Sequence, residues 1–455
     1  SGMLIDLDKV PAREQGMTAY ELLLSESQER MLVVAEKGRE QEIIDVYKKW
    51  DLNAIVIGEV TDTGKVIYMK DGEIKADIPA HSLVLGGGAP VYIRETKKPA
   101  YLEKTMSFDE STVEESRPME VVITDLLESP NIASKRWVFE QYDHMVRTNT
   151  VSGPGPSDAA VIRIKGSDKG LAVKTDCNGR YVYLNPRRGG QIAVIEAARN
   201  VVCAGGKPVA ITNCLNFGNP YKPELYWVFK EAVGGMGDAC RVLNTPVTGG
   251  NVSFYNENPK GAVFPTPTIG MLGIVENVER DTTTAGFKSE GDVVLYIGAP
   301  RKGLGGSEYL SWCHKLTTGD APVLDLEFEK KLQEALLHNI RSGNIKSAHD
   351  ISDGGLAIAV AEKCIFGGHG AHIDLTQLGG NTLDTLFSEA QSGVIISISP
   401  EKLEQVEKIF SDHNVPVYPI GTVRGKDLRI EGLTGLNVAN MKAIYEGAIP
   451  KAMSH

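Results

Sequence analysis

The chain has 455 residues, of which 42% are hydrophobic and 24% are charged, and its net charge at pH 7 is −11. This apolar material is enough for two or three globular domains, each with its own core. Basic residues form no run longer than a pair, so nucleic acid is excluded as a partner. No apolar run reaches the ~18 residues of a membrane span, which predicts a soluble protein without a membrane partner.

The cysteines favour a reducing compartment. Six are present, and no two of them form a C-x-x-C pair or another spacing typical of a metal site. Small buried thiols are the favoured interpretation, and they suit a cytoplasmic protein. The six are Cys177, Cys203, Cys214, Cys240, Cys313 and Cys364.

A motif near the N-terminus occurs twice in the chain. "LLSESQERMLVV" at 23–34 is repeated as "LFSEAQSGVIIS" at 386–397, with Ser25 aligned to Ser388 at an offset of 363 residues. The alignment continues without a gap to Gly58 and Gly421. The shared pattern is an apolar run, an amphipathic helix and a second strand closed by glycine, which predicts a β-α-β unit with a strand at 31–33.

The two copies differ in what precedes them. About 95 residues of fold, beginning at the strand "VVLYIG" (293–298), lead to the second copy, whereas 24 residues precede Ser25. We therefore expect residues 1–98 to be the C-terminal part of a truncated domain and the chain to be a fragment of a longer protein. Residues 99–130 are polar, contain proline and are weakly patterned, which predicts a linker.

Residues 131–285 alternate strand and helix patterns and predict an α/β domain. Strands are expected at "AAVIRI" and "GLAVKTD" (170–176). Helices are expected at "QIAVIEAARNVV" and "PELYWVFKEAVGGMGDACRVL", each with an apolar stripe. Pro223 suits the first turn of the second helix. Both helices are expected to pack on a sheet.

Polar and glycine clusters follow the strands of this domain. They include Asp158, Asp176, 213–218 and 249–253. Ligands of open α/β sheets gather at strand ends, glycine lets a phosphate approach the backbone, and Asp and Asn oxygens can hold magnesium. The same residue types also make ordinary turns. Four clusters in one domain favour a nucleotide or magnesium site.

Residues 290–455 predict a further domain with two ambiguous motifs. "SAHDISDGGLAIAV" places His349, Asp350 and Asp353 before an apolar helix. Asp353 either caps that helix or belongs to a helix N-terminus that faces an anion or a magnesium phosphate. "RKGLGGSEYL" (301–310) is likewise either a glycine turn capped by Ser307 or a phosphate nest.

Taken together, several strings resemble one enzyme family. "GLAVKTD", "LNFGNP", "TPVTGGNVSFYNE", "HDISDGGLA" and the doubled S-E-x-Q resemble phosphoribosylformylglycinamidine synthases of purine biosynthesis, from about Met3 to the C-terminus. The wider superfamily includes aminoimidazole ribonucleotide synthetase, selenophosphate synthetase and thiamin monophosphate kinase. The resemblance implies an α/β (α+β) fold with tandem N- and C-domains, of which the first copy is truncated here. Its second N-domain would be 131–285 and its second C-domain 290–455.

The resemblance also implies a reaction and its ligands. ATP would phosphorylate the formamide oxygen of formylglycinamide ribonucleotide, and ammonia would displace phosphate to give the amidine, with Mg²⁺ on the phosphates. Position by position, the substrate contacts would be Glu26, Ser27, Gln28 and Ser253, the ATP contacts Asn213 and Gly250, and the metal ligand Asn251. The catalytic histidines of the family would lie outside this chain, so the fragment alone is expected to be inactive.

Two positions depart from the family pattern. An acid is more usual at Asn213, and Asn178 occupies the place of a catalytic histidine, although an amide cannot act as a general base near neutral pH. No glutaminase domain is visible, so the implied partners are a separate glutaminase subunit and a small accessory subunit. The alternatives are another superfamily kinase or cyclo-ligase, or a non-catalytic nucleotide-binding module.

Overall fold

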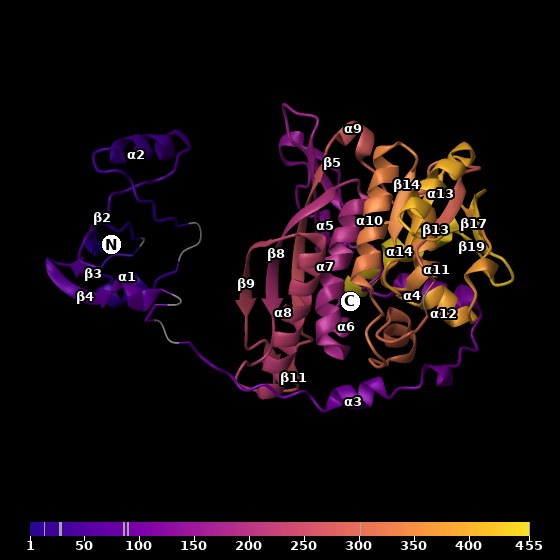
Figure 1. Ribbon diagram of the computed structural model, residues 1–455, viewed down its shortest axis with the longest axis horizontal. Helices are drawn as coiled ribbons and strands as arrows, with labels where there is room; N and C mark the ends of the chain where they lie inside the picture. The colour runs from indigo at the N-terminus through magenta and orange to yellow at the C-terminus, as the bar shows by residue number, and fades with distance from the viewer. Residues whose placement is uncertain (13, 27–29, 85–86, 89–90, 301, 455) are drawn as a thin grey trace. The chain divides into compact units, whose positions relative to one another are not determined.

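The computed structural model describes residues 1–12, 14–26, 30–84, 87–88, 91–300 and 302–454. The chain divides into two compact units, Ser1–Ile93 and Arg94–His455. Figure 1 shows the elements of each unit with the labels used below.

The first unit contains a four-stranded sheet with the order β2-β1-β3-β4. β1 and β3 are parallel, while β1 pairs with β2 and β3 with β4 in antiparallel fashion. Helix α1 begins at a capping box, because Glu21 N donates to Thr18 Oγ1 and Thr18 N donates to Glu21 Oε2. The bounds are β1 Gly2–Asp6, α1 Ala19–Leu24, α2 Glu40–Lys49, β2 Gly58–Thr61, β3 Lys65–Lys70 and β4 Glu73–Pro79.

The second unit contains a six-stranded sheet of order β5-β6-β7-β12-β8-β9. Only β8 and β9 are parallel among these pairs in the described part of the chain. The strands are β5 Thr150–Ser152, β6 Ala160–Arg163, β7 Gly170–Asp176, β8 Lys207–Asn216, β9 Val247–Ser253 and β12 Thr266–Val275, with a small hairpin formed by β10 Glu257–Asn258 and β11 Gly261–Ala262.

Two long helices, α7 (Pro186–Cys203) and α8 (Pro223–Leu243), pack together beside this sheet (Figure 1). The predicted helices are thus confirmed. Asn185 caps α7 by accepting a hydrogen bond from Arg188 N, and Pro186 occupies the first turn. The apolar stripe of α7 forms one core with β8 and β12. Two short helices belong to this part, α6 (Gly179–Leu184) and α9 (Val278–Asp281).

A seven-stranded sheet with the order β14-β16-β13-β17-β15-β18-β19 follows. Alternate residues of β13 face two separate cores. Leu295 and Ile297 pack against helices α10 and α13, whereas Val294 and Tyr296 belong to the core of α11 and α14. The strands are β13 Val293–Ile297, β14 Ser347–Asp350, β15 Ala371–Ile373, β16 Val394–Ile398, β17 Val417–Val423, β18 Asp427–Ile430 and β19 Thr434–Asn437. The helices are α10 Leu326–Arg341, α11 Gly355–Gly367, α12 Thr382–Phe387, α13 Leu403–Asp412 and α14 Val438–Met453.

The internal repeat predicted from the sequence is present in the fold. The order β2-β1-β3-β4 corresponds to β17-β15-β18-β19, and the pairs are antiparallel, parallel and antiparallel in both sheets. Helices α1 and α2 have the bounds of α12 and α13 displaced by 363 residues. The first unit therefore contains about half of the architecture of the seven-stranded sheet.

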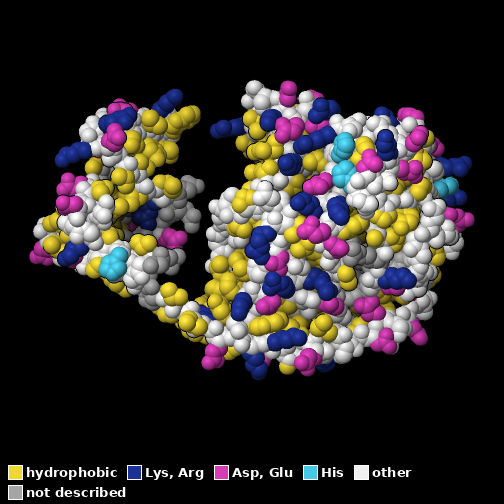
Figure 2. Space-filling view, in the orientation of Figure 1, with side chains coloured by type: hydrophobic (Ala, Val, Ile, Leu, Met, Phe, Trp, Pro, Cys, Tyr) yellow, Lys and Arg dark blue, Asp and Glu magenta, His cyan; other side chains and the backbone are white. Residues whose placement is uncertain are grey.

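The strand predicted at 31–33 is absent. Residues 31–36 have no regular structure, although their counterpart β16 is a strand between β13 and β14. A strand requires partners for its backbone groups, and the described residues of the first unit provide no equivalent of β13 or β14. Met31 and Leu32 are therefore 81% and 62% exposed, and Figure 2 shows such apolar side chains on the surface of this unit.

The linker predicted at 99–130 requires a correction. It contains helices α3 (Tyr101–Met106) and α4 (Met119–Glu128), and α5 (Arg136–Phe139) follows shortly after. α4 contributes four fully buried side chains to the core of the seven-stranded sheet, namely Val122, Ile123, Leu126 and Leu127. Their spacing places them on one helical face, a pattern that the polar flanks of the segment obscured. The other domain boundaries given above remain predictions.

Candidate functional site

The six-stranded sheet places several of the predicted site residues in one row. Asp176 of β7 lies opposite Ile269 of β12, which in turn lies opposite Asn213 of β8. Asn213 lies opposite Gly250 of β9. Because neighbouring strands are about 4.8 Å apart, Asp176 and Gly250 are roughly 14 Å apart along this row. Three of the polar clusters seen in the sequence therefore share one row of the sheet without forming a single pocket.

The other two predicted residues of β9 follow in the same register. Asn251 lies opposite Cys214 and is exposed, while Ser253 lies opposite Asn216 and is half-buried. Ser253 Oγ is 3.4 Å from Asn256 Oδ1. The structure thus brings the ATP, metal and substrate residues predicted on β8 and β9 together at the edge of the sheet.

Gly250 is required by the backbone itself. Its φ is +150°, and a Cβ atom at this position would lie 2.1 Å from Asn213 Oδ1. Any other residue would be strained and would also displace the Asn213 side chain. Replacing this glycine would therefore impair folding as well as the binding of any ligand that approaches the strand.

The substrate turn predicted in the first unit is described only in part. Glu26 is exposed and follows helix α1. Ser27 and Gln28 lie outside the described residues.

A second cluster, which we call the buried charged layer, lies between the two sheets of the second unit. It joins β7 and α7 to α10, β14, Glu362 of α11 and the turn at 388–391. Its members are Asp158, Lys174, Asp176, Glu196, Arg199, Asn200, Glu329, His349, Asp350, Glu362 and Gln391.

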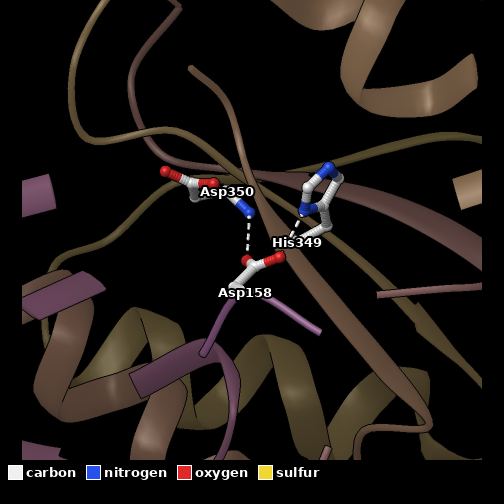
Figure 3. Close-up of side chains that lie close together, drawn as sticks. All are labelled: Asp158, His349 and Asp350. Carbon is white, nitrogen blue, oxygen red and sulfur yellow. Dashed lines mark hydrogen bonds and ion pairs between the residues drawn. The ribbon is translucent and has the colours of Figure 1, made fainter. Parts of the chain in front are cut away.

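Three of these side chains, Asp158, His349 and Asp350, place one potential ligand atom each within 4.8 Å of the others, close enough to hold a metal ion (Figure 3). His349 Nδ1 is 2.6 Å from Asp158 Oδ1 and its Nε2 is 3.0 Å from Glu362 Oε2. Burial alone would lower the pKa of His349, but the attraction of Asp158 and the hydrogen bonds to Asp158 and Glu362 raise it to about 10. This environment favours the protonated imidazole, whose two ring nitrogens both donate hydrogen bonds.

Asp158 is fully occupied by protein partners as well. Its Oδ1 faces His349, and its Oδ2 accepts a hydrogen bond of 2.9 Å from Asp350 N. Burial opposes ionisation, yet the attraction of His349 keeps the pKa of Asp158 below its usual range. This ion pair therefore ties the segment before β6 to β14.

Three neighbouring acids are less fully compensated. Burial raises the pKa values of Asp176, Glu196 and Asp350, the last to about 6, although Arg199 opposes the shift in all three. Repulsion from nearby carboxylates adds to the effect of burial for Glu196 and Asp350. The Asn200 amide lies among them, since its Nδ2 is 3.4 Å from Asp176 Oδ2 and 3.3 Å from Asp350 Oδ2. The Asn200 NH2 group donates toward both carboxylates, so it stabilises their charges and offers no ligand oxygen to this group.

Arg199 holds the buried charged layer together. Its side chain is fully buried, and NH1 lies 3.1 Å from Glu329 Oε2 while NH2 donates to Gln391 Oε1 at 2.9 Å. Nε is 3.5 Å from Asp350 Oδ2. Burial opposes the charge, but Glu329 and Asp350 raise the pKa of Arg199. One cation on α7 thus contacts α10, β14 and the second S-E-x-Q turn.

Glu389, in that same turn, resolves both ambiguous motifs of the sequence. Its Oε1 accepts hydrogen bonds from Gly354 N at 2.7 Å and Glu308 N at 2.6 Å, and Tyr181 OH also donates to its carboxylate. A buried acid therefore occupies the N-terminus of α11 and the turn at Glu308, and Ser307 Oγ accepts from Leu310 N as a turn cap. Burial and Asp353 raise the pKa of Glu389 to about 8.

Asn178 and Asp353 meet at the margin of this layer. Asn178 Nδ2 donates to Asp353 Oδ1 at 2.9 Å, and Asn178 Oδ1 caps α6 by accepting from Arg180 N. Gly354, not Asp353, is the N-cap residue of α11. Asp353 is therefore not the helix cap that one reading of the sequence suggested.

The sequence did not predict Glu196, Arg199 or Glu389 as site residues. A usable signal was present in α7, where Glu196, Arg199 and Asn200 are spaced by three and four residues inside an otherwise apolar helix. Charged residues that remain on a buried helical face are seldom there without partners or a ligand.

Comparisons with known proteins agree with the geometry. The family model of the AIR synthase related protein, N-terminal domain, matches residues 156–275. The corresponding C-terminal domain model matches both 1–70 and 289–431, the two copies of the repeat. The PurL subunit of phosphoribosylformylglycinamidine synthase from Salinibacter ruber is 55% identical over 100% of this chain. The chain belongs to this synthase family.

Solved structures of the family share the fold. Thermotoga maritima PurL complexed with ATP is 26% identical, with a TM-score of 0.61, over 93% of this chain and 60% of that one. A structure of PurLQS from the same organism gives the same identity and TM-score. The chain spans about three fifths of the length of these relatives, 62% in the Salinibacter ruber protein. No helix in the described ranges combines the length and apolarity needed to cross a membrane.

Proposed function

We propose that this chain provides part of an enzyme that uses ATP to convert formylglycinamide ribonucleotide to formylglycinamidine ribonucleotide. The observation that carries the proposal is the 55% identity to a phosphoribosylformylglycinamidine synthase subunit along the whole chain. The matched C-terminal domain model at both ends supports a duplicated N-domain and C-domain arrangement. On this proposal, a first N-domain with the catalytic histidines completes the enzyme.

Within that enzyme, the residues at the sheet edge have separate roles. Asn213 and Gly250 contact the nucleotide, Asn251 supplies a neutral oxygen to Mg²⁺, and Ser253 contacts the ribonucleotide. Their adjacent register on β8 and β9 supports this grouping. Glu26, Ser27 and Gln28 form the substrate turn of the first repeat. Because Asn213 is neutral, it can donate or accept a hydrogen bond but adds no charge.

The buried charged layer serves the second copy of the site. Among the described residues of this layer, Asp158, His349 and Asp350 are the group whose ligand atoms lie close enough together to hold a metal ion, and a cation there would supply positive charge for the phosphates of a nucleotide. Asn178 donates to Asp353 and cannot accept a proton as a general base. This copy therefore binds a nucleotide without catalysis.

The nitrogen source is a partner protein. Ammonia would come from a separate glutaminase subunit with a small accessory subunit. The relatives are themselves named as one subunit of a synthase, and the Thermotoga maritima protein also occurs in a structure named PurLQS, which supports a complex of several subunits. The six cysteines are all unpaired in the described chain, which supports assembly in the reducing cytoplasm.

The roles at the sheet edge can be tested in the assembled enzyme by steady-state kinetics. Asn251→Ala is expected to raise the magnesium requirement, and Ser253→Ala to raise the KM for the ribonucleotide with little change in the KM for ATP. Ser167→Ala, in the turn between β6 and β7, is the control. If both edge variants retain the parental kinetics, the edge is only a structural turn and the assignment is wrong.

A further inference from the structure

The second C-domain contains a small cavity that none of the roles above uses. It has a volume of about 40 Å³ and lies between β13, the loop after it, helix α12 and the turn at 388–391. One water molecule needs roughly 10–15 Å³ of such space, so the cavity holds about three. Leu356 and Ile351 form an apolar wall, and the polar lining comes from Lys302, Asp384, Thr385 and Ser388.

Ser388 provides the first sign of a ligand. This residue is 7% exposed, and its Oγ is buried without a hydrogen-bond partner among the described residues. A buried hydroxyl without a partner is costly, because it has lost water and gained nothing in return. Since Ser388 lines the cavity, a polar ligand there would satisfy it.

The cavity also carries one charge of each sign. Lys302 is exposed at its rim, and no ion pair in the described part of the chain includes it. Asp384 accepts hydrogen bonds from Gly303 N at 3.3 Å and from Asn381 Nδ2 at 2.8 Å, both of which are uncharged donors. Neither charge is therefore paired with an opposite charge among the described residues, although both line the same small space.

The position of Lys302 is built into the fold. Lys302 Cε packs against Gly380, where an added Cβ would lie 3.3 Å from it. The φ of Gly380 is +94°, which favours glycine at this position, and the missing side chain leaves room for the lysine. From the other side, Glu110 Oε2 accepts a hydrogen bond of 2.7 Å from Leu304 N. The segment before α4 thus fixes the loop that carries Lys302.

We propose that this cavity binds a small α-amino acid such as glycine. The ammonium of Lys302 pairs with its carboxylate, the carboxylate of Asp384 pairs with its amino group, and Ser388 Oγ completes the hydrogen bonds. A simple anion would meet the charge of Asp384, and a simple cation would meet that of Lys302. A zwitterion is the ligand whose two charges match both, and the size of the cavity restricts its side chain.

Isothermal titration calorimetry of the whole chain tests this assignment, with glycine, L-alanine, L-valine, acetate and methylammonium as probes. Glycine is expected to bind in the millimolar range, as befits so few atoms, and acetate and methylammonium at least about tenfold more weakly, because each satisfies one charge only. L-valine is expected not to bind, since its side chain exceeds the space.

Three variants report on the contacts. Lys302→Gln, Asp384→Asn and Ser388→Ala are each expected to weaken glycine binding by about fivefold or more. Lys408→Gln, an exposed lysine on α13, is the matched control and should leave it unchanged. Thermal melts confirm that each variant is folded. The proposal is overturned if glycine gives no binding at about 20 mM, if acetate binds as well as glycine, or if the three folded variants bind as tightly as the parent.

Discussion

Arg199→Met offers the sharpest test of the buried charged layer. Methionine keeps much of the volume of the arginine but removes the charge, so Glu329 at 0% and Asp350 at 2% side-chain exposure lose their buried cation. Removing one partner of a buried ion pair costs about 3–5 kcal/mol. We expect the free energy of unfolding of the second unit to fall by about that amount.

Urea denaturation followed by tryptophan fluorescence measures this change, and a double variant identifies its cause. Arg199→Met with Glu329→Leu removes both charges, and we expect it to recover about half of the lost stability or more, because replacing a buried pair by apolar groups is often neutral. Arg241→Met is the matched control, since Arg241 has 73% side-chain exposure and pairs only at the surface. A loss below about 1 kcal/mol for Arg199→Met would show that Arg199 does not hold the layer together.

Three further predictions concern the backbone, the pH and the corrected helix. Gly250→Ala should lower the free energy of unfolding by about 1–3 kcal/mol, because its φ is +150° and the new Cβ would collide with Asn213. Gly249→Ala is the control and should have little effect in the same urea titration, because a Cβ at Gly249 meets nothing within 4 Å. The pKa of Glu389 is raised from about 4.5 in the unfolded chain to about 8 in the folded protein. The stability that protonated Glu389 contributes is therefore complete below pH 4.5 and is lost as the pH rises through 8, so the melting temperature should fall from pH 5 to pH 8.5. A Glu389→Gln variant whose melting temperature falls equally with pH would contradict this. Leu126→Ala should lower the free energy of unfolding by about 2–5 kcal/mol in urea denaturation, because Leu126 is fully buried on α4. Val121→Ala should lower it by less than about 1 kcal/mol, because Val121 is 42% exposed.

The sequence predicted the elements whose signal is local and periodic. The offset of 363 residues identified the repeat, and the topology of the two sheets follows it strand by strand. The stripes of α7 and α8 and the proline at the start of α8 were sufficient to place both helices. These features can be predicted because the buried face of a helix is encoded in the spacing of apolar residues within its own sequence.

What the sequence could not predict depends on partners distant along the chain. Residues 31–33 have the composition of a strand, but a strand forms only where neighbours exist. Asp158 and His349 are 191 residues apart in the sequence, yet they form a buried ion pair. Glu389 accepts hydrogen bonds from Glu308 N and Gly354 N, which precede it by 81 and 35 residues. Each of these outcomes required the tertiary arrangement.

The central claim is that this chain supplies one part of a synthase that is completed by a first N-domain. The most direct test measures ADP formation that depends on formylglycinamide ribonucleotide, with ammonium as the nitrogen source, for the chain alone and after co-expression with the remaining region of the Salinibacter ruber relative. We predict no turnover by the chain alone and measurable turnover by the assembled protein. Turnover by the chain alone, or none from an assembled and folded complex, would contradict the account.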